Sequence, residues 1–357
     1  MTPTGPRGVA FPDALLPITE RVEARIDALL ERELERWRAV DEHLAEPMAA
    51  LRSFVAGGGK RLRPAFCICA YAGAGGDPSS PIVIDAAAAL ELVHTFALVH
   101  DDVMDGSETR RGFDAVHRRF ARLHAAGPWR GESRRFGEGM AILVGDFALV
   151  YGDMLFRSAP PEACDVFDEL RVELCVGQSL DLIGTAAAST DRTTAQTIAT
   201  YKSGKYTVER PLHLGAALAG RLREFEAPLT AIGLPLGEAF QLRDDVLGAF
   251  GESEITGKPV GDDLREGKAT PLMAMAYARA GEHDMATLGQ AGSLDLDAAG
   301  IDAIHDVLVR TGALADIEDE IERLVRQARD AIATTSLDEP ARSWLDDLAC
   351  YVAWRDR

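Results

Sequence analysis

Two groups of aspartates in this sequence have the residue types and spacing of a metal site. Asp101 and Asp105 are four residues apart, so on a helix they lie on one face, with Asp102 on the adjacent flank. Asp244 and Asp245 form a second group, after another apolar segment. No Lys or Arg stands at the helical spacing that would neutralise the first group, so its crowded carboxylates are costly unless cations lie between the oxygens. The pattern predicts sites for a hard cation such as Mg2+, which prefers oxygen ligands and shares them with phosphates.

Basic residues stand in short clusters near these aspartates. The clusters are Lys60-Arg61-Leu62-Arg63 after Gly57-Gly58-Gly59, Arg110-Arg111, and Lys202 with Lys205. Taken alone, one DDxxD sequence is as typical of a solvated helix end as of a metal site. An isolated Arg pair is more typical of a solvated surface, and a glycine triplet is more typical of a flexible turn. Together, and in a chain with a net charge of −19, they indicate clamps for a diphosphate, because Arg offers bidentate contacts and Lys a point charge.

The segments that carry these residues have the hydrophobic period of helices. In residues 18–55, apolar positions recur every three or four residues with charges between them. Further Ala- and Leu-rich segments, with few of the alternating β-branched runs typical of strands, cover residues 64–73, 82–105, 139–157, 164–187, 194–203, 207–220 and 228–250, and helices resume from 271 to 355. No internal repeat or low-complexity linker separates them. The sequence predicts one all-α domain over residues 18–357, after a Pro- and Gly-rich flexible tail over 1–17.

Composition excludes several classes of function. A net charge of −19 opposes binding to DNA or RNA, which normally requires a basic face. The five cysteines are scattered without zinc-ligand spacing, which is typical of reduced thiols in a cytoplasmic protein. The most apolar stretches, 82–99 and 140–151, are interrupted by acidic residues or histidine, and the first 17 residues lack the apolar core of a signal peptide. We therefore expect a soluble protein without a membrane span.

Taken in order along the chain, the motifs resemble those of trans-isoprenyl diphosphate synthases, the polyprenyl synthetase family, from about residue 57 to residue 270. They are Gly58-Gly59-Lys60-Arg61-Leu62-Arg63-Pro64, Glu91-Leu92-Val93-His94, Leu98-Val99-His100-Asp101-Asp102-Val103-Met104-Asp105, Arg110-Arg111-Gly112, Gly177-Gln178 with Asp181-Leu182, Tyr201-Lys202-Ser203-Gly204, Phe240-Gln241 with Asp244-Asp245, and Gly257-Lys258 through Gly267-Lys268. The resemblance implies an all-helical bundle of the isoprenoid synthase type around a deep central apolar cavity, usually in a homodimer. It also implies three Mg2+ ions, for which Mn2+ can substitute.

The resemblance assigns roles position by position. Asp101, Asp105 and Asp244 would coordinate the metal ions, with Asp102 and Asp245 as further ligands or acting through bound water. The allylic substrate, which is dimethylallyl, geranyl or farnesyl diphosphate, would be held through its diphosphate by Arg110, Lys202 and Lys258, and Lys202 would also act catalytically on the leaving group. Isopentenyl diphosphate would be held by Lys60, Arg63, His94 and Arg111. Gln178 and Gln241 would be polar neighbours of the metal-bound diphosphate, and Lys268 a more peripheral basic partner.

Two positions depart from the family pattern. Gly248 stands where many relatives have a third Asp in the second motif, and Ser203 replaces the commoner Thr after Lys202. Neither change removes an implied main ligand. Gly248 does leave the second aspartate motif weaker than the first.

The implied reaction is a head-to-tail condensation. An allylic diphosphate ionises while metal ions and basic residues stabilise the leaving group, the π-bond of isopentenyl diphosphate attacks C1 of the allylic cation, and a proton leaves. No nucleophilic side chain is required. Chain length would be set by an apolar floor below the first motif, where Phe96 precedes the small Ala97. One aromatic residue here, with no insertion in the motif, resembles synthases of the C20 product geranylgeranyl diphosphate, although Phe96 is also compatible with ordinary core packing.

Three alternatives stay open. The product would be farnesyl diphosphate (C15) if the floor lay higher. A class I terpene cyclase on the same fold would not need an isopentenyl diphosphate site, and the implied set Lys60, Arg63, His94 and Arg111 opposes it. A noncatalytic helical subunit resembles heteromeric relatives that have lost their Asp motifs, and the presence of both motifs here opposes that function.

Overall fold

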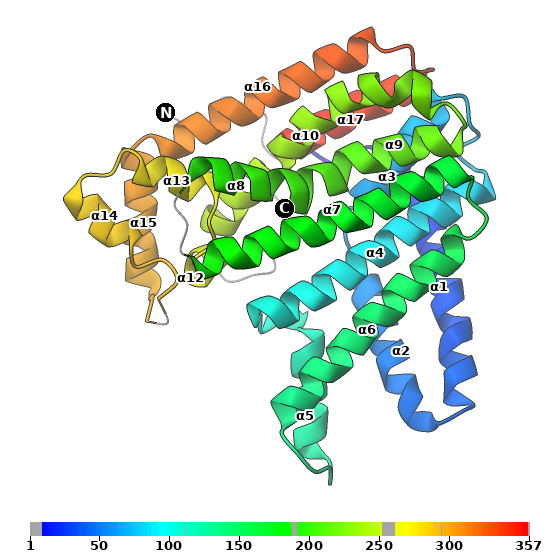
Figure 1. The fold of residues 1–357 in the computed structure, drawn as a ribbon, viewed down its shortest axis with the longest axis horizontal. Helices are drawn as coiled ribbons and strands as arrows, with labels where there is room; N and C mark the ends of the chain where they lie inside the picture. Colours follow the sequence, from blue (N-terminus) through cyan, green and yellow to red (C-terminus); the bar gives the residue numbers. More distant parts are fainter. Residues whose placement is uncertain (1–8, 111, 188–190, 252–260, 294, 356–357) are drawn as a thin grey trace. The chain divides into compact units, whose positions relative to one another are not determined.

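The computed structural model describes residues 9–110, 112–187, 191–251, 261–293 and 295–355. Within these residues nearly all regular structure is helical, and the one sheet is an antiparallel hairpin of β1 (Thr109–Arg110) and β2 (Phe113–Asp114) (Figure 1). The predicted all-α fold class is confirmed. The chain divides into two compact units: an amino-terminal unit of Asp13–Ile68 and Asp77–Pro161, and a carboxy-terminal unit of Met1–Pro12, Cys69–Gly76 and Glu162–Arg357. The single domain over residues 18–357 stays a prediction.

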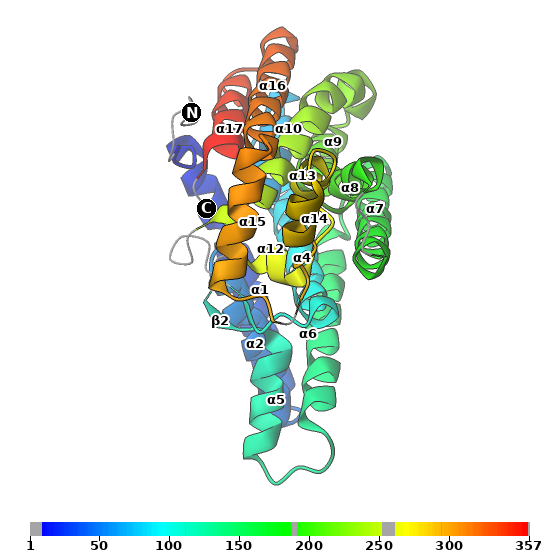
Figure 2. The ribbon, with the colours of Figure 1, turned by 90° about the vertical axis from the view of Figure 1, so that its left-hand side faces the viewer.

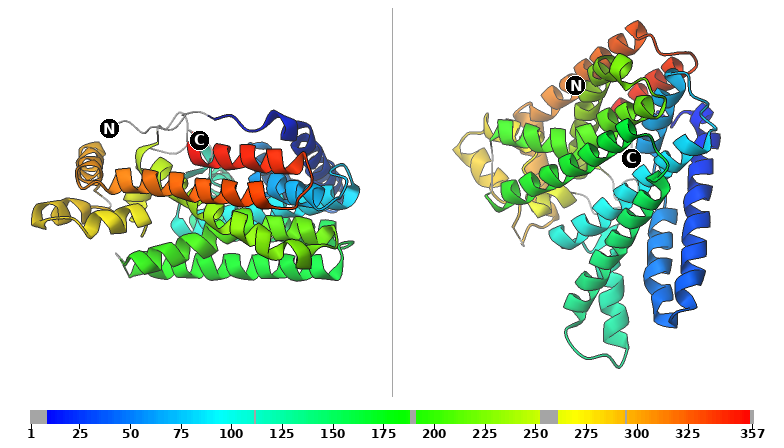
Figure 3. Two further views of the ribbon diagram at one scale, coloured as in Figure 1. Left: turned by 90° about the horizontal axis from the view of Figure 1, so that it is seen from above. Right: turned by 45° about the vertical axis from the view of Figure 1, so that its right-hand side comes forward.

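The amino-terminal unit is built mainly from long helices. They are α1 (Leu16–Arg38), α2 (Ala45–Ala56), α4 (Pro81–Asp105), α5 (Val116–Ala126) and α6 (Ser133–Phe156), with the 3-10 turns η1 (Asp13–Leu15) and η2 (Glu42–Leu44) and the first residues of α3 (Leu62–Gly73). α1 and α2 lie side by side (Figure 3), and α5 pairs with α6 (Figure 2). α4 is apolar along most of its length and packs on α6, so it forms the centre of this unit's core.

The boundaries of α4 determine where the first aspartate motif lies. Pro81 occupies the first turn, where its missing N–H would have no helical partner anyway. The helix ends at Asp105 and is capped by Gly106, whose backbone is left-handed with φ 69° and whose N–H donates to the carbonyl of Asp102. On α6, a side chain at Gly145 would overlap the ring of His100, so glycine lets the two helices approach closely here. The motif therefore forms the last turn of a helix that is firmly packed.

The carboxy-terminal unit continues the helical chain. Its elements are α7 (Pro161–Ala186), α8 (Arg192–Ala199), the π-helix η3 (Thr200–Glu209), α9 (Arg210–Leu218), α10 (Leu222–Phe250), α12 (Asp262–Glu266), α13 (Pro271–Tyr277), α14 (Glu282–Leu288), α15 (Ala298–Arg310), α16 (Ala313–Thr334) and α17 (Ala341–Trp354). α10, which carries the second aspartate motif, packs against η3, α9, α16 and α17, and α16 lies alongside α17 (Figure 3). The core of this unit is therefore arranged around α10.

The helices predicted over 194–203 and 207–220 are not separated by a break. Residues 200–209 continue the helix with π geometry, which is frequent at functional sites. A Cβ at Gly177 of α7 would lie only 2.5 Å from the Cα of Lys202 in η3. Glycine is therefore needed for the close approach of α7 to η3.

An ion-pair network ties η3 and the start of α9 to α7. Lys205 Nζ and Arg210 Nε donate to the carboxylate of the buried Glu173 at 2.8 and 2.6 Å. Burial alone would raise the pKa of Glu173, but the hydrogen bonds from Arg210 and Lys205 outweigh it and lower that pKa below its ordinary value. The charged form of Glu173 is thus the form that holds η3 in place.

α4 and α6 are both long and apolar enough to cross a membrane, with mean hydropathies of 1.9 and 1.5 over their most apolar windows. The protein buries 67% of the most apolar window of α4 and 44% of that of α6. Core helices of soluble proteins have the same length and composition, so these two helices establish no membrane span.

Candidate active site

The first aspartate motif occupies the C-terminal end of α4. Asp102 is 1% exposed, whereas Asp101 and Asp105 are partly exposed. The carbonyl end of a helix carries a partial negative charge, which adds to the repulsion among the three carboxylates and favours cations beside them. The position and the charge of the motif therefore suit a metal ion that is shared with a diphosphate.

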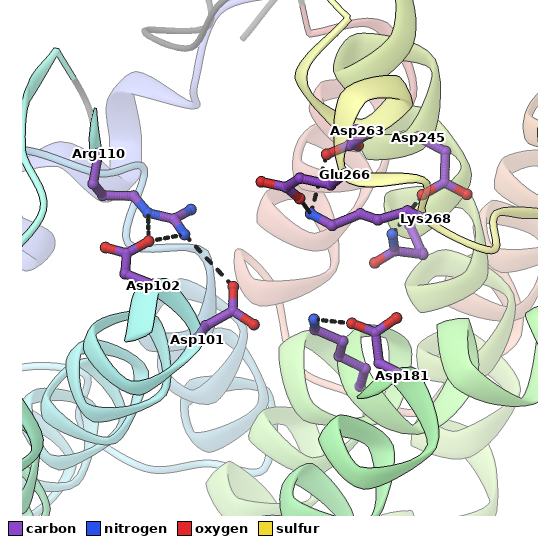
Figure 4. Close-up of polar contacts among 10 residues, drawn as sticks. Asp101, Asp102, Arg110, Asp181, Asp245, Asp263, Glu266 and Lys268 are labelled. Atoms are coloured by element: carbon purple, nitrogen blue, oxygen red, sulfur yellow. Dashed lines mark hydrogen bonds and ion pairs between the residues drawn. The ribbon is translucent and has the colours of Figure 1, made fainter. Parts of the chain in front are cut away.

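Arg110 neutralises part of this charge, although it does not stand at helical spacing from the aspartates. Its Nε donates to Asp102 Oδ1 at 2.8 Å, its Nη2 bonds the same oxygen, and Nη2 lies 3.5 Å from Asp101 Oδ2 (Figure 4). Helical spacing does not reveal this contact, because α4 ends before Gly106. Arg110 lies in strand β1, eight residues after Asp102, and the chain turns back to bring the two together. Arg110 is thus placed to orient Asp102 and to meet an anion bound at Asp101.

The residues implied for isopentenyl diphosphate come from separate elements of the amino-terminal unit. Lys60 lies in the loop before α3, Arg63 in the first turn of α3, and His94 on α4. His94 is seven residues before Asp101, which places both on one face of the helix. All three basic side chains are partly exposed. Arg111 lies outside the described residues.

Arg61, in the same basic cluster, has a structural role. Its buried guanidinium donates to Glu91 at 2.6 Å, to Glu23 at 2.9 Å and to the carbonyl of Val55 at 2.8 Å. Burial opposes its charge, but the two carboxylates raise the pKa of Arg61 above its ordinary value. The backbone of Arg61 is left-handed, with φ 50°, and these three contacts hold the strained loop that presents Lys60.

In the carboxy-terminal unit, η3 positions Lys202. Its Nζ donates to Oδ2 of the buried Asp181 on α7 at 2.5 Å (Figure 4). Gln178 lies on α7 one turn before Asp181 and is partly exposed. The sequence motif that contains Asp181 did not reveal a role for it. Its contact with Lys202, 21 residues away, depends on how α7 and η3 pack. Asp181 is therefore a further residue of the candidate site.

Asp244 of the second motif lies on α10, and its side chain is 41% exposed. Arg355 Nη2 donates to Asp244 Oδ1 at 2.6 Å and to the carbonyl of Phe240 at 3.3 Å. The guanidinium lies 4.2 Å from the centroid of the Phe240 ring, which holds it by a cation–π contact. The sequence does not reveal Arg355, since 111 residues separate it from Asp244. Arg355 thus orients the carboxylate of Asp244.

Asp245 is 4% exposed, and Gln241 Nε2 donates to its Oδ1 at 2.7 Å. Burial raises the pKa of Asp245 well above its ordinary range, and the negative charges of Asp263 and Asp244 raise it further. The hydrogen bond from Gln241 and the positive charge of Lys268 lower this pKa, but they do not outweigh the burial. Among the described residues, Asp245 Oδ2 has no hydrogen-bond partner. A nearby cation would lower the raised pKa of Asp245 and would give its Oδ2 a partner. This buried carboxylate therefore fits a place beside a metal ion.

Lys268 follows α12 and contacts two carboxylates. Its Nζ lies 3.1 Å from Asp263 Oδ1 and 2.7 Å from Glu266 Oε2 (Figure 4). Lys258 lies outside the described residues. In the described part of the chain, no three His, Cys, Asp or Glu side chains are close enough to hold a metal ion unaided.

Comparison with known proteins agrees with the motifs. The family described as Polyprenyl synthetase matches residues 44–299. Geranylfarnesyl diphosphate synthase of Aeropyrum pernix is 31% identical over 310 residues, which cover 84% of this chain and 91% of that protein. (2E,6E)-Farnesyl diphosphate synthase of Mycobacterium tuberculosis is 33% identical over 307 residues, which cover 83% of this chain and 80% of that protein. A solved structure of geranylgeranyl pyrophosphate synthase from Corynebacterium glutamicum, complexed with isoprenyl diphosphate and magnesium, has a TM-score of 0.87 and 33% identity, covering 93% of this chain and 98% of that one.

These relatives carry names for products of different length, and their identities to this chain are nearly equal. Overall identity therefore does not set the chain length of a product. The fold agrees over almost the whole chain, and the family match covers more than two thirds of it. The resemblance inferred from the motifs is thus confirmed, and this chain belongs to the polyprenyl synthetase family of prenyl-transferring enzymes.

Proposed function

We propose that this chain condenses isopentenyl diphosphate with an allylic diphosphate, head to tail and with trans geometry, to give geranylgeranyl diphosphate. The observation that carries the proposal is that each aspartate motif has a cationic side chain beside it. Arg110 contacts Asp101 and Asp102, and Arg355 contacts Asp244. Carboxylates for dications and cationic groups for phosphate oxygens are what the departure of a diphosphate requires.

The chemistry needs a stabilised leaving group and a carbocation kept from water. Bound Mg2+ would supply neutralisation of the charge that develops on the diphosphate when the allylic C1–O bond breaks. Arg110 and Lys202 would each donate hydrogen bonds to oxygens of the leaving group. The π electrons of isopentenyl diphosphate form the new bond to C1, and the released diphosphate takes the proton. The apolar length of α4 before Asp101 excludes water from the cation.

The proposal includes three Mg2+ ions, for which Mn2+ can substitute. Asp101, Asp105 and Asp244 would be the main ligands, and Asp102 and Asp245 would be supporting groups. The bond of Asp102 to Arg110 and the burial of Asp245 support this division, as does the magnesium in the Corynebacterium glutamicum structure. The substrate roles implied for the basic residues and the two glutamines belong to the same proposal.

Ala97 and Phe96 on α4 support the C20 product. Ala97 is one turn before Asp101 and shares its face, so a small side chain there leaves room for a growing hydrocarbon below the motif. The ring of Phe96 is turned to His100 in an edge contact, with 4.6 Å between the ring centroids, and His100 Nε2 lies 3.0 Å from the carbonyl of Ile142 on α6. Ala97 therefore bears more directly than Phe96 on the length of the product.

Product analysis tests the function. The purified protein is incubated with Mg2+, radiolabelled isopentenyl diphosphate and, in turn, dimethylallyl, geranyl or farnesyl diphosphate, and the products are sized by chromatography after removal of the diphosphate. We expect a linear C20 alcohol from each primer. A C15 end product would favour the farnesyl diphosphate alternative. A cyclic hydrocarbon, or no product from any primer, would overturn the proposed function.

A homodimer is part of the proposal, and α7 offers the surface for it. Large apolar side chains on this helix are exposed at the spacing of one helical face; they are Val172, Val176, Leu182 and Ile183. The most exposed of them is Ile183, at 65%. Several exposed apolar side chains on one helix are typical of an interaction site, and a second copy with the same residues would cover them in an isologous pairing.

Val176→Arg is expected to shift the protein from dimer to monomer, because it places a charge among these apolar residues of α7. Sedimentation velocity at several protein concentrations measures the change. Val309→Arg is the matched control, since Val309 is also exposed, at 58% against 45% for Val176, but lies on α15. A V176R protein that sediments like the wild type would show that these residues are not the interface.

A cytoplasmic location completes the proposal. All five cysteines are free, and Cys67 and Cys69 are buried. Free thiols are typical of proteins in a reducing compartment. Fractionation of producing cells, with immunodetection of the chain, tests the location, and recovery with the membranes after a high-salt wash would contradict it.

A further inference from the structure

The π-helix η3 packs closely on α10 as well as on α7. A Cβ at Gly233 of α10 would lie only 2.7 Å from the Cα of Glu209. A Cβ at Gly237 would overlap the carbonyl oxygen of Gly204. Such contacts fix how near η3 lies to its neighbours. They do not fix how far the helix is turned about its own axis, because glycine offers no side chain for a neighbour to hold.

Pro211, at the start of α9, favours a wider turn at the end of η3. Proline has no N–H, and in a regular α-helix its ring would clash with the carbonyl four positions earlier, that of Thr207. The neighbouring N–H of Arg210 donates to the carbonyl of Lys205, which is five positions back. A bond between residues five apart is the mark of π geometry. The sequence therefore favours this geometry just before α9.

Glu173 of α7 binds two cationic side chains that a π turn brings to one side of the helix. Arg210 is bidentate, with Nε 2.6 Å from Glu173 Oε2 and Nη2 2.7 Å from Oε1. Lys205 Nζ lies 2.8 Å from the same Oε1. In an α-helix, residues five apart point about 140° away from each other. With bonds from i to i+5 they lie one above the other, so Glu173 stabilises the π turn over an α turn.

The same turn determines where Lys202 points. Glu173, Gly177 and Asp181 follow one another at intervals of four residues along one side of α7. Lys202 Nζ donates to Asp181 at the far end of this row, at 2.5 Å (Figure 4). A change of η3 toward α geometry by one residue would turn Lys202 by about 100° about the helix axis. Its ammonium group would then leave Asp181.

We propose that Glu173, by pairing with Lys205 and Arg210, holds η3 in its π turn and so aims Lys202 at the diphosphate of the allylic substrate. Glu173 is a positioning residue, because it acts through Lys202. Its side chain is buried, so salt screens these ion pairs much less than it screens pairs on the surface. The effect on the substrate rests on the proposed function, whereas the hold on η3 does not.

Hydrogen exchange tests the hold on η3 without any substrate. We expect the backbone amides of residues 200–210 to exchange about tenfold faster in Glu173→Gln and in Lys205→Met, because each change removes a charge from the cluster. Lys205→Arg keeps the charge and is expected to exchange like the wild type. Asp346→Asn is the matched control: it removes a carboxylate of α17 that is paired with Arg329 at 2.7 Å, and it should leave this segment unchanged. Calorimetric unfolding checks that each variant is folded, and K205M with K205R carries the test if E173Q is not.

Steady-state kinetics test the link to Lys202. We expect E173Q and K205M each to lower kcat by about tenfold and to raise KM for the allylic diphosphate. KM for isopentenyl diphosphate should stay unchanged, since the residues implied for it lie in the amino-terminal unit. E173Q combined with Lys202→Met should be no less active than K202M alone, because Glu173 acts through Lys202.

Unchanged exchange over residues 200–210 in folded E173Q and K205M would overturn the hold on η3. Losses that multiply when E173Q and K202M are combined, or an equal rise of both KM values, would overturn the link to Lys202. Product formation by the wild type reports separately on the proposed function. A protein that makes no prenyl product but exchanges faster in E173Q and K205M would refute the function and support the hold of Glu173 on η3.

Discussion

Asp101→Asn is expected to lower kcat by about 10³-fold, because the change removes one anionic ligand from the metal ions that neutralise the leaving diphosphate. Lewis-acid stabilisation of this kind contributes several kcal/mol, and each 1.4 kcal/mol corresponds to a tenfold change in rate. Asp101 lies partly exposed at the end of α4, where its Oδ2 is 3.5 Å from Arg110 Nη2. Steady-state kinetics with each allylic primer, together with Mg2+ titrations, measure the effect.

Asp102→Asn is the matched control for this prediction. Asp102 is buried and bonded to Arg110, and an asparagine of the same shape can still accept a hydrogen bond from it. We expect a loss of about tenfold, the size typical of a group that supports a ligand. Equal losses in D101N and D102N would contradict the division into essential and supporting aspartates, and so would a D101N enzyme with normal Mg2+ activation.

Ala97→Phe is expected to shorten the main product from C20 to C15. The new ring would project from the face of α4 that carries Asp101, one turn lower, where it would block the path of the growing hydrocarbon. Chromatography of the dephosphorylated products, with geranyl and farnesyl diphosphate as primers, measures the product distribution. Farnesyl diphosphate should become a poor primer, because its own chain already reaches the new ring.

Phe96→Leu provides the comparison at the neighbouring position. The ring of Phe96 is turned to His100, so we expect a smaller change in product length than in A97F. Circular dichroism during heating distinguishes altered specificity from a damaged fold. If A97F still makes the C20 product at a normal rate, the floor of the cavity lies on other helices.

Sequence patterns predicted the positions of the motifs within the helices well. The apolar run before Asp101 is a local signal, and the helix predicted over 82–105 ends where α4 ends, with the first motif on its last turn. The break predicted between the helices 194–203 and 207–220 was wrong, because the chain stays helical through these residues. Ser203 and Gly204 are poor helix formers, but the packing of η3 against α7 overrides that preference.

Contacts between distant parts of the chain were beyond what spacing can predict. Arg110 reaches Asp102 only because a hairpin follows α4, and Lys202 meets Asp181 only because two helices pack closely. Arg111 and Lys258 lie outside the described residues, and their substrate roles stay predictions.

The ion pair between Arg355 and Asp244 couples the end of α17 to the second motif. A protein that is shortened before residue 355 would lose this pair and would uncover the ring of Phe240, which the guanidinium now covers. Asp244 would then be free to rotate, and its affinity for a cation would be that of an unrestrained surface carboxylate. Metal constants measured on such a truncated protein would therefore describe a different site, even if the fold and every motif residue were intact.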